Sequence, residues 1–165
     1  MLPAPIPADE SRRLSALRDL LILDTPPEAR FDRIAQFACA EFDAPIVLVS
    51  LVDRDRQWFK ARVGLDACET ERAVSFCGHA ILQPGVLVVE DARRDARFAD
   101  NPLVTGAPSI RFYAGAPLVL ASGAAVGTLC LIDTVPRPFD AVDRSILSAL
   151  GRLVTEELQG IAEAV

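Results

Sequence analysis

Residues 75–81 (Ser-Phe-Cys-Gly-His-Ala-Ile) bring together the side chains of this chain best suited to chemistry at close range. They include His79, the single histidine, and Cys77, one of four cysteines. A thiolate is both a nucleophile and a metal ligand, and a nearby imidazole can stabilise it. The spacing therefore raises two hypotheses, a reactive thiol and a metal site.

The other cysteines give the metal hypothesis little support. Cys39, Cys68 and Cys130 are widely scattered and form no CxxC pair, whereas structural zinc sites use closely spaced ligands. Cys39 lies in a helical pattern and Cys130 in a hydrophobic strand, so both are expected to be small core residues. The sequence predicts no metal site and requires no disulfide.

Composition limits the classes of protein further. The chain has 165 residues, 51% of them hydrophobic and 24% charged, which is typical of one folded domain. A net charge of −6 argues against nucleic acid as a partner. The sequence has neither a signal-peptide pattern nor a run of ~20 apolar residues, so we expect no membrane association and a cytoplasmic location.

Hydrophobic periodicity predicts the elements that must position these residues. An N-terminal helix is expected at 9–22, with Arg12 and Arg13 away from its apolar face. In the next helix Thr25 would be the N-cap and Glu28 the partner of a capping box. Residues 1–8 are expected to be a disordered tail, and residues 9–165 a single domain.

The middle of the chain is predicted to be mostly strands. Strand 45–52 is apolar at both parities and so should be central, whereas 57–64 alternates like a half-exposed strand, with Trp58 and Lys60 on the polar side. Ser75 would cap a short helix at 76–82. Three further strands are predicted at 86–89, 112–120 and 124–132. An irregular connection is predicted at 91–109, between the first two of them.

The last helix, from near Asp140 to the end, carries two apolar stripes. One contains Val142, Ile146, Ala149 and Leu153. The other contains Leu147, Leu150, Val154, Leu158, Ile161 and Val165. One stripe is enough to reach the core of the domain. The second would pack on the N-terminal helix or form a dimer interface.

This order of elements predicts an α+β domain, in which helices bracket an antiparallel sheet. Six segments resemble the GAF domain, in the branch found in bacterial diguanylate cyclases, sensor histidine kinases and stand-alone proteins. They are Ile-Leu-Asp-Thr-Pro-Pro-Glu through Phe-Asp at 22–32, 49–60, Glu-Thr with Ser-Phe-Cys-Gly-His-Ala-Ile at 69–81, 95–104, 111–118 and 127–133. The resemblance covers nearly the whole chain, from about residue 10 to residue 158.

The resemblance implies an antiparallel sheet of five or six strands, with terminal helices on one face and a short helix plus a long lid loop on the other. A small-molecule pocket would lie between the sheet and the lid, which here is 91–110. Pockets of this kind are mostly apolar with a few fixed polar groups. Its expected lining comprises Phe76, Cys77, His79, Asp91, Phe98, Arg111, Tyr113 and Cys130.

Three specific functions of known GAF-fold proteins can be compared with this sequence. Free methionine-(R)-sulfoxide reductases use cysteines around this pocket, and Cys77 resembles one of them, but the lid at 91–110 has no cysteine to resolve it. Bilin photosensors attach their chromophore through a Cys-His dipeptide, which Gly78 interrupts here. The signature of cyclic-nucleotide-binding GAF domains is not evident.

Structural roles compete with each functional one. His79 would bond a backbone carbonyl and tie the short helix to the lid, and Trp58 would pack over the sheet edge. Arg111 would pair with a lid carboxylate, Asp95 or Asp100. Asp53 and Asp133 would make turns at strand ends.

The sequence thus predicts a non-enzymatic sensory module that binds an unidentified small molecule and signals through its terminal helices. The expected partners are a second copy of the chain, paired through those helices, and a signalling output protein. Two alternatives stay open. One is a dimerisation module whose interior is filled by Phe76, Phe98 and Tyr113, and the other is a redox protein that uses Cys77.

Overall fold

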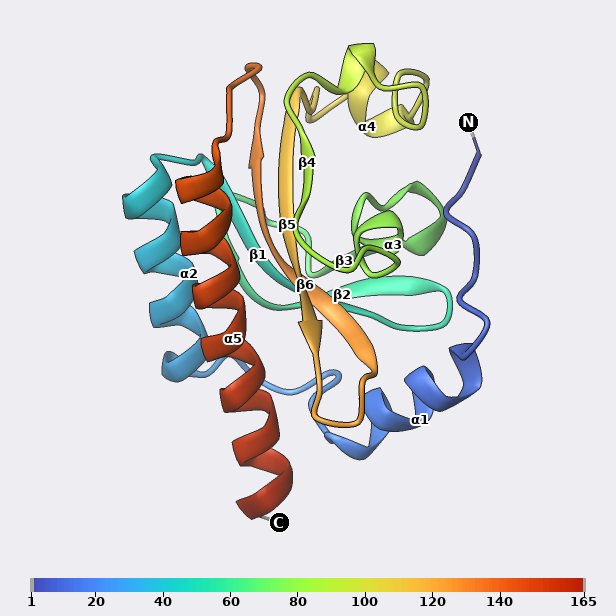
Figure 1. Ribbon diagram of the computed structural model, residues 1–165, viewed down its shortest axis with the longest axis vertical. Coiled ribbons are helices and arrows are strands. Elements are labelled where there is room, and N and C mark those ends of the chain that lie inside the picture. Colours follow the sequence, from blue (N-terminus) through green and yellow to red (C-terminus); the bar gives the residue numbers. More distant parts are fainter. Residues whose placement is uncertain (1, 165) are drawn as a thin grey trace.

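Six strands form one antiparallel sheet at the centre of the molecule (Figure 1). The computed structural model describes the backbone of residues 2–164 and the side chains of residues 2–160. The strand order is β3-β2-β1-β6-β5-β4. The bounds are β1 (Ile46–Val52), β2 (Arg56–Val63), β3 (Glu69–Glu71), β4 (Leu87–Val89), β5 (Phe112–Val119) and β6 (Ala125–Asp133). The α+β prediction is confirmed. Strand β1 lies in the middle of the sheet, as predicted, and all of its residues are buried because both of its faces are covered.

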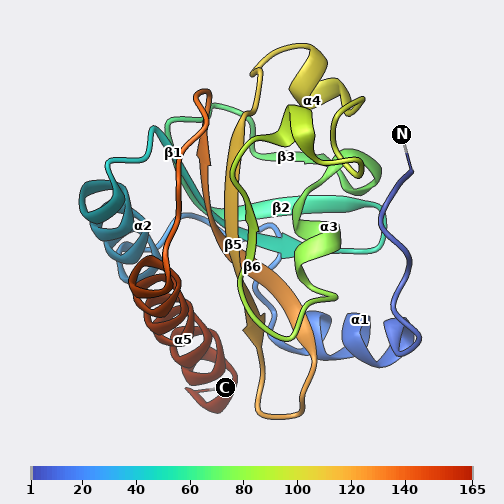
Figure 2. The same ribbon diagram turned by 45° about the horizontal axis from the view of Figure 1, so that its top comes forward.

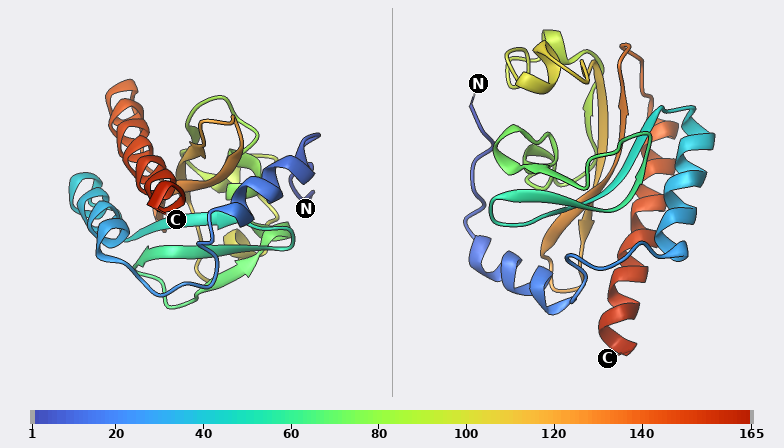
Figure 3. Two further views of the ribbon diagram at one scale, coloured as in Figure 1. Left: turned by 90° about the horizontal axis from the view of Figure 1, so that it is seen from below. Right: turned by 180° about the vertical axis from the view of Figure 1, so that it is seen from behind.

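Helices α2 (Ala29–Phe42) and α5 (Ala141–Ala164) cover one face of the sheet, side by side (Figures 1 and 3). The stripe of Leu147, Leu150, Val154 and Leu158 is buried against β5 and α2. The partner of α5 is therefore α2, not the N-terminal helix. The other stripe is open at Val142 and Leu153, which are exposed, whereas its Ile146 is partly buried against the core. The side chains of Ile161 and Val165 lie outside the described residues.

Helix α1 (Glu10–Asp19) crosses the end of the sheet, beside β6 (Figure 1). Its apolar residues Leu14 and Leu17 are buried, as the helical pattern predicts. The expected disorder of residues 1–8 stays a prediction; in the structure the segment has no helix or strand before α1, and Figure 3 shows it passing α3. No helix within residues 2–164 is long and apolar enough to span a membrane.

The opposite face of the sheet is covered by short elements and loops (Figure 2). They are η1 (Arg72–Val74), α3 (Cys77–Ala80), η2 (Ala92–Arg94) and α4 (Pro102–Thr105). The Gly78 N–H donates to Ser75 Oγ at 3.1 Å, which confirms Ser75 as the cap of the short helix. Asn101 donates to the Val74 carbonyl at 3.0 Å and thereby ties the lid, residues 91–110, to η1.

Two local predictions are wrong, for one shared reason. Helix α2 starts at Ala29 rather than after Thr25, and Lys60 on β2 is buried rather than exposed. The Lys60 ammonium binds Thr25 Oγ1 at 2.8 Å, the Pro26 carbonyl at 2.6 Å and the Glu28 carboxylate at 2.7 Å. These acceptors compensate for burying the charge, and they hold residues 25–28 as an irregular segment outside the helix. Trp58 is likewise part of the core beneath α2, not a cover of the sheet edge.

Candidate functional site

Cys77 lies on the inner face of the sheet, which is the face covered by α3 and the lid, and two hydroxyl groups donate hydrogen bonds to its sulfur. Tyr113 on β5 donates to Cys77 Sγ at 3.3 Å, and Thr128 on β6 donates to it at 3.1 Å. All three side chains are almost completely buried. Ser50 on β1 is opposite Thr128 in the sheet, and its hydroxyl donates to Gln57 Oε1 at 3.0 Å. The thiol of α3 is therefore held by donors from two adjacent strands, β5 and β6.

Cys130 on β6 is the second thiol near this sulfur, a partnership that the sequence does not predict although both cysteines belong to the expected pocket lining. Thr128 and Cys130 are two residues apart on β6, so their side chains point to the same face. The Tyr113 hydroxyl lies over Gly115, which is opposite Cys130, and it donates to Cys77 Sγ, so the two thiols lie close together in the same buried cluster. The expectation that Cys77 has no second thiol within reach is wrong. It considered only the lid, whereas the second thiol comes from the sheet beneath.

Gly115 makes room for this arrangement. It is opposite Cys130 in the β5–β6 ladder, and the Tyr113 ring folds over it. A Cβ on Gly115 would lie 2.8 Å from ring carbons of Tyr113 and closer still to its hydroxyl oxygen. Any side chain at residue 115 would therefore displace the phenol from Cys77.

Hydrogen bonding makes the Cys77 thiol more acidic than the Cys130 thiol. The hydrogen bond from Cys130 lowers the pKa of Cys77, against the opposing effect of burial, and Thr128 and Tyr113 lower it further. The same hydrogen bond, followed by burial, raises the pKa of Cys130 well above its usual value. Burial and the negative charge of Cys77 raise the pKa of Tyr113. The cluster is arranged to hold one thiolate beside one thiol.

Aromatic rings close the space above this cluster. Phe76 and Phe98 stack with centroids 4.1 Å apart and planes 5° apart, and Tyr113 contacts Phe76 at 5.2 Å. His79 meets the edge of Phe98 at 4.9 Å, so it ties the short helix to the lid through a ring contact. Burial, followed by the charge of Arg97, lowers the pKa of His79, which Asp95 partly opposes. The expected sheet–lid interior is thus packed, and ligand binding inside it stays a prediction.

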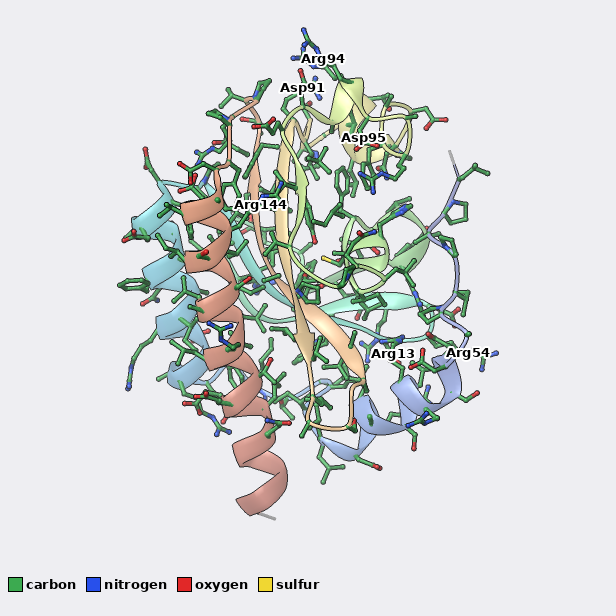
Figure 4. The ribbon with its side chains drawn as sticks, in the orientation of Figure 1. Arg13, Arg54, Asp91, Arg94, Asp95 and Arg144 are labelled. Atoms are coloured by element: carbon green, nitrogen blue, oxygen red, sulfur yellow. The ribbon has the colours of Figure 1, made fainter. Side chains whose placement is uncertain are left out.

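The two charged candidates lie outside this interior. Asp91 accepts hydrogen bonds from the backbone and guanidinium of Arg93 at 2.9 to 3.1 Å. Arg111 donates to the carbonyls of Val104 at 2.8 Å and Ile110 at 3.0 Å, which braces the base of the lid. Asp95 pairs with Arg97, so the predicted pairing of Arg111 with Asp95 is wrong. Figure 4 shows Asp91, Arg94 and Asp95 at the lid end of the molecule, with Arg13 at the opposite end.

A buried charged cluster joins α1 to the segment before α3. Both Arg13 and Arg72 donate to the Glu10 carboxylate, and Arg13 also donates to the Val52 carbonyl at 2.6 Å. Arg13 is only 1% exposed, although the helical pattern placed it on the polar face. The Glu10–Arg13 spacing of three residues was the available signal for their contact. Nothing in the sequence pointed to Arg72.

Open surface grooves lie elsewhere. One of about 530 Å³ runs along β2 and is lined by residues that include Gln36, Trp58 and Cys68. Among the described residues, no group of three or more histidine, cysteine, aspartate or glutamate side chains could hold a metal ion.

Comparison with known proteins decides the family. Residues 26–158 match the family described as GAF domain. The chain belongs to the GAF domain family. A cyclic di-GMP phosphodiesterase of Pseudomonas aeruginosa is 46% identical over 155 residues, which are 93% of this chain and 26% of that protein. The GAF chain therefore spans about a quarter of the length of this relative.

Solved structures confirm the GAF fold. The free methionine-R-sulfoxide reductase of Neisseria meningitidis, in complex with its substrate, superposes with a TM-score of 0.68 at 18% identity, covering 100% of this chain and 99% of that one. The GAF domain of an Acinetobacter phosphoenolpyruvate-protein phosphotransferase gives 0.68 at 17% identity, covering 96% and 97%. At these identities the likeness shows the fold alone.

Proposed function

We propose that this GAF domain is a non-enzymatic sensory module whose input site is the interior between the sheet and the lid. One observation carries the proposal. Phe76 and Phe98 close an apolar interior over a polar floor built from Cys77, Tyr113 and Thr128. The interior is packed in the structure, so a ligand would have to open it, and its lining, mostly apolar with a few fixed polar groups, has the usual composition of a small-molecule site.

Input at this site would act by shifting a population. A ligand that enters must part the Phe76–Phe98 stack, and it therefore favours a state in which the lid is raised. Residue 76 follows directly on the segment of Arg72 and Ser75, whose side chains bond Glu10 and the Gly78 amide. Raising the lid would thus change the contacts that α1 makes through Glu10.

The output we propose is cyclic di-GMP turnover or another signalling reaction. The Pseudomonas relative is named as a cyclic di-GMP phosphodiesterase, and this chain matches about a quarter of it. A signalling output protein, joined covalently or bound as a partner, would respond to the terminal helices.

A homodimer formed through the terminal helices is part of the proposal. Val142 and Leu153 are exposed on the outer side of α5, and Phe37 is exposed on the neighbouring α2. Leu153→Glu should shift a dimer to monomer in sedimentation velocity, whereas Leu82→Glu, at an exposed leucine outside these helices, should leave the mass unchanged. A monomeric parent would remove the dimer from the proposal.

Binding and turnover distinguish the sensor from an enzyme. Calorimetric titration with cyclic GMP, cyclic AMP, cyclic di-GMP and methionine-(R)-sulfoxide should find a ligand whose affinity falls in Tyr113→Phe but not in Phe37→Ala. Native mass spectrometry of protein purified from its own host would show a retained molecule directly. If that protein is empty and none of the four compounds binds, a bound ligand is ruled out as the input. Sustained reduction of methionine sulfoxide with dithiothreitol would instead assign an enzyme.

A further inference from the structure

We infer that Cys77 and Cys130 form a redox pair that closes a reversible disulfide when a peroxide enters the sheet–lid interior. The inference rests on the proposed function, because it names oxidation as the input read at that site. The sequence pattern predicts Cys130 to be a small core residue, and the family resemblance puts it in the same pocket lining as Cys77 without pairing the two thiols. Their juxtaposition is a result of the fold.

The geometry brings the two sulfurs together from independent elements. Cys77 comes from α3 and Cys130 from the central strand β6, and both thiols are buried in one cluster. Thr128, two residues before Cys130 on the same face, holds Cys77 Sγ at 3.1 Å. On the other side the Tyr113 hydroxyl, which lies over Gly115 opposite Cys130, holds Cys77 Sγ at 3.3 Å, so both contacts place that sulfur next to Cys130. The remaining thiols are not part of this cluster, since Cys68 is exposed and Cys39 donates to the Ala44 carbonyl on the other side of the sheet.

The chemistry needs one thiolate, one thiol and hydrogen peroxide. The Cys77 thiolate attacks one peroxide oxygen, the O–O bond breaks, and Cys77 becomes a sulfenic acid while the departing hydroxide takes up a proton to form water. The Cys130 sulfur then attacks Cys77 Sγ, losing its proton as the hydroxyl group leaves as a second water. Two thiols are thereby oxidised to one disulfide and one peroxide is reduced to two waters. A dithiol reductant reverses the step.

Closing the bond would move α3. The two sulfurs must come within about 2.05 Å of each other, which draws Cys77 toward β6 and breaks its bonds to Tyr113 and Thr128. The α3 segment is tied upstream through Ser75 and Arg72 to Glu10 of α1. Oxidation would therefore change the same path to α1 that a raised lid would change.

Burial sets the rate of this reaction. Cys77 is 2% and Cys130 0% exposed, so peroxide must enter through a local opening of the lid. A small neutral oxidant passes such an opening, whereas a bulky disulfide reagent does not. We expect hydrogen peroxide to oxidise the pair much faster than oxidised glutathione does.

The test is disulfide mapping after peroxide treatment of the reduced folded protein. Wild type and C39S/C68S, which keeps only the cluster thiols, are treated with hydrogen peroxide, alkylated, digested and read by mass spectrometry. A Cys77–Cys130 cross-linked peptide should appear in both proteins and vanish after dithiothreitol. In C39S/C68S/C130A the reaction should stop at a Cys77 sulfenic acid that dimedone traps, while C39S/C68S/C77A should leave Cys130 unmodified.

The wild-type map keeps the test independent of whether the variants fold. If the exposed Cys68 is oxidised in wild type while Cys77 and Cys130 stay reduced, the inference is overturned. Titrating the same reduced protein with the four compounds above separates the two proposals. If a compound binds and no disulfide forms, the ligand-binding sensor is supported and the redox pair is overturned. A disulfide in a protein that binds none of the compounds supports the redox pair and assigns it as the input itself.

Discussion

The ring of Phe76 stacks on the ring of Phe98, with centroids 4.1 Å apart and planes within 5°. The first residue directly precedes α3, and the second belongs to the lid, so this one contact joins the two segments that cover the inner face of the sheet. Stacked aromatic pairs add about 0.5–1.5 kcal/mol to the energy of burying their area. In this GAF domain the stack holds the interior closed over Cys77.

Phe98→Ala should lower the free energy of unfolding by about 3–5 kcal/mol, because it removes a fully buried ring and leaves a cavity. Urea denaturation followed by circular dichroism measures the change. Phe37→Ala is the matched control: its ring is 56% exposed on α2, and we expect a change below about 1 kcal/mol. Equal losses in the two variants would mean that the lid contact does not hold the interior.

Glu10→Gln should weaken the acid dependence of stability. Burial raises the pKa of Glu10, but the hydrogen bonds from Arg13 and Arg72 outweigh it and lower the pKa to about 2. Since the folded pKa lies below the unfolded one, the charge stabilises the fold above about pH 4.5 and this contribution is lost as the pH falls toward 2. The unfolding free energy of wild type should exceed that of Glu10→Gln at pH 7 by about 2 kcal/mol, and the curves should converge toward pH 2.

The control for this prediction is Glu41→Gln, at an exposed position of α2. It should follow the wild-type curve at every pH. A constant gap between Glu10→Gln and wild type from pH 7 to pH 2 would show that the carboxylate charge is not what binds the two arginines.

Gly115→Ala should destabilise the domain by about 1–3 kcal/mol, because the added Cβ overlaps the Tyr113 phenol and forces the ring to move. Gly160→Ala, in α5 with nothing within 4 Å of the new Cβ, should instead stabilise by about 0.5–1 kcal/mol. Thermal unfolding of both variants beside wild type checks the pair. A neutral Gly115→Ala would contradict the close packing of Tyr113 against the floor.

Thr128→Val should make Cys77 less acidic, since the hydroxyl that donates to its sulfur is lost while the shape of the side chain is kept. In the C39S/C68S background, the pH midpoint of Cys77 alkylation by iodoacetamide should move upward. Thr155→Val, a buried threonine that bonds the Gly151 carbonyl in α5, should leave the midpoint in place. An unchanged midpoint in both variants would show that Thr128 does not stabilise the thiolate.

The sheet was predictable, because strand patterns such as 46–52, which is apolar except for Ser50, follow directly from burial on both faces. The position of Cys77 on the short helix was also predictable from the family segments. Contacts between residues far apart in sequence were not. The neighbour of Cys77 is Cys130, and the acceptors of Lys60 lie more than thirty residues upstream. No local pattern encodes such pairs, so Lys60 and Arg13 were placed on polar faces although partners allow their burial.

The central claim is that events in the sheet–lid interior reach the terminal helix α1. Amide hydrogen exchange of Phe98→Ala against wild type tests it most directly. Peptides of β1 and β6 report any global loss of stability, so changes are read relative to them. We expect faster exchange in the lid, in α3 and in α1, beyond any change in β1 and β6. Faster exchange confined to the lid and α3, with α1 at its wild-type rate, would contradict it.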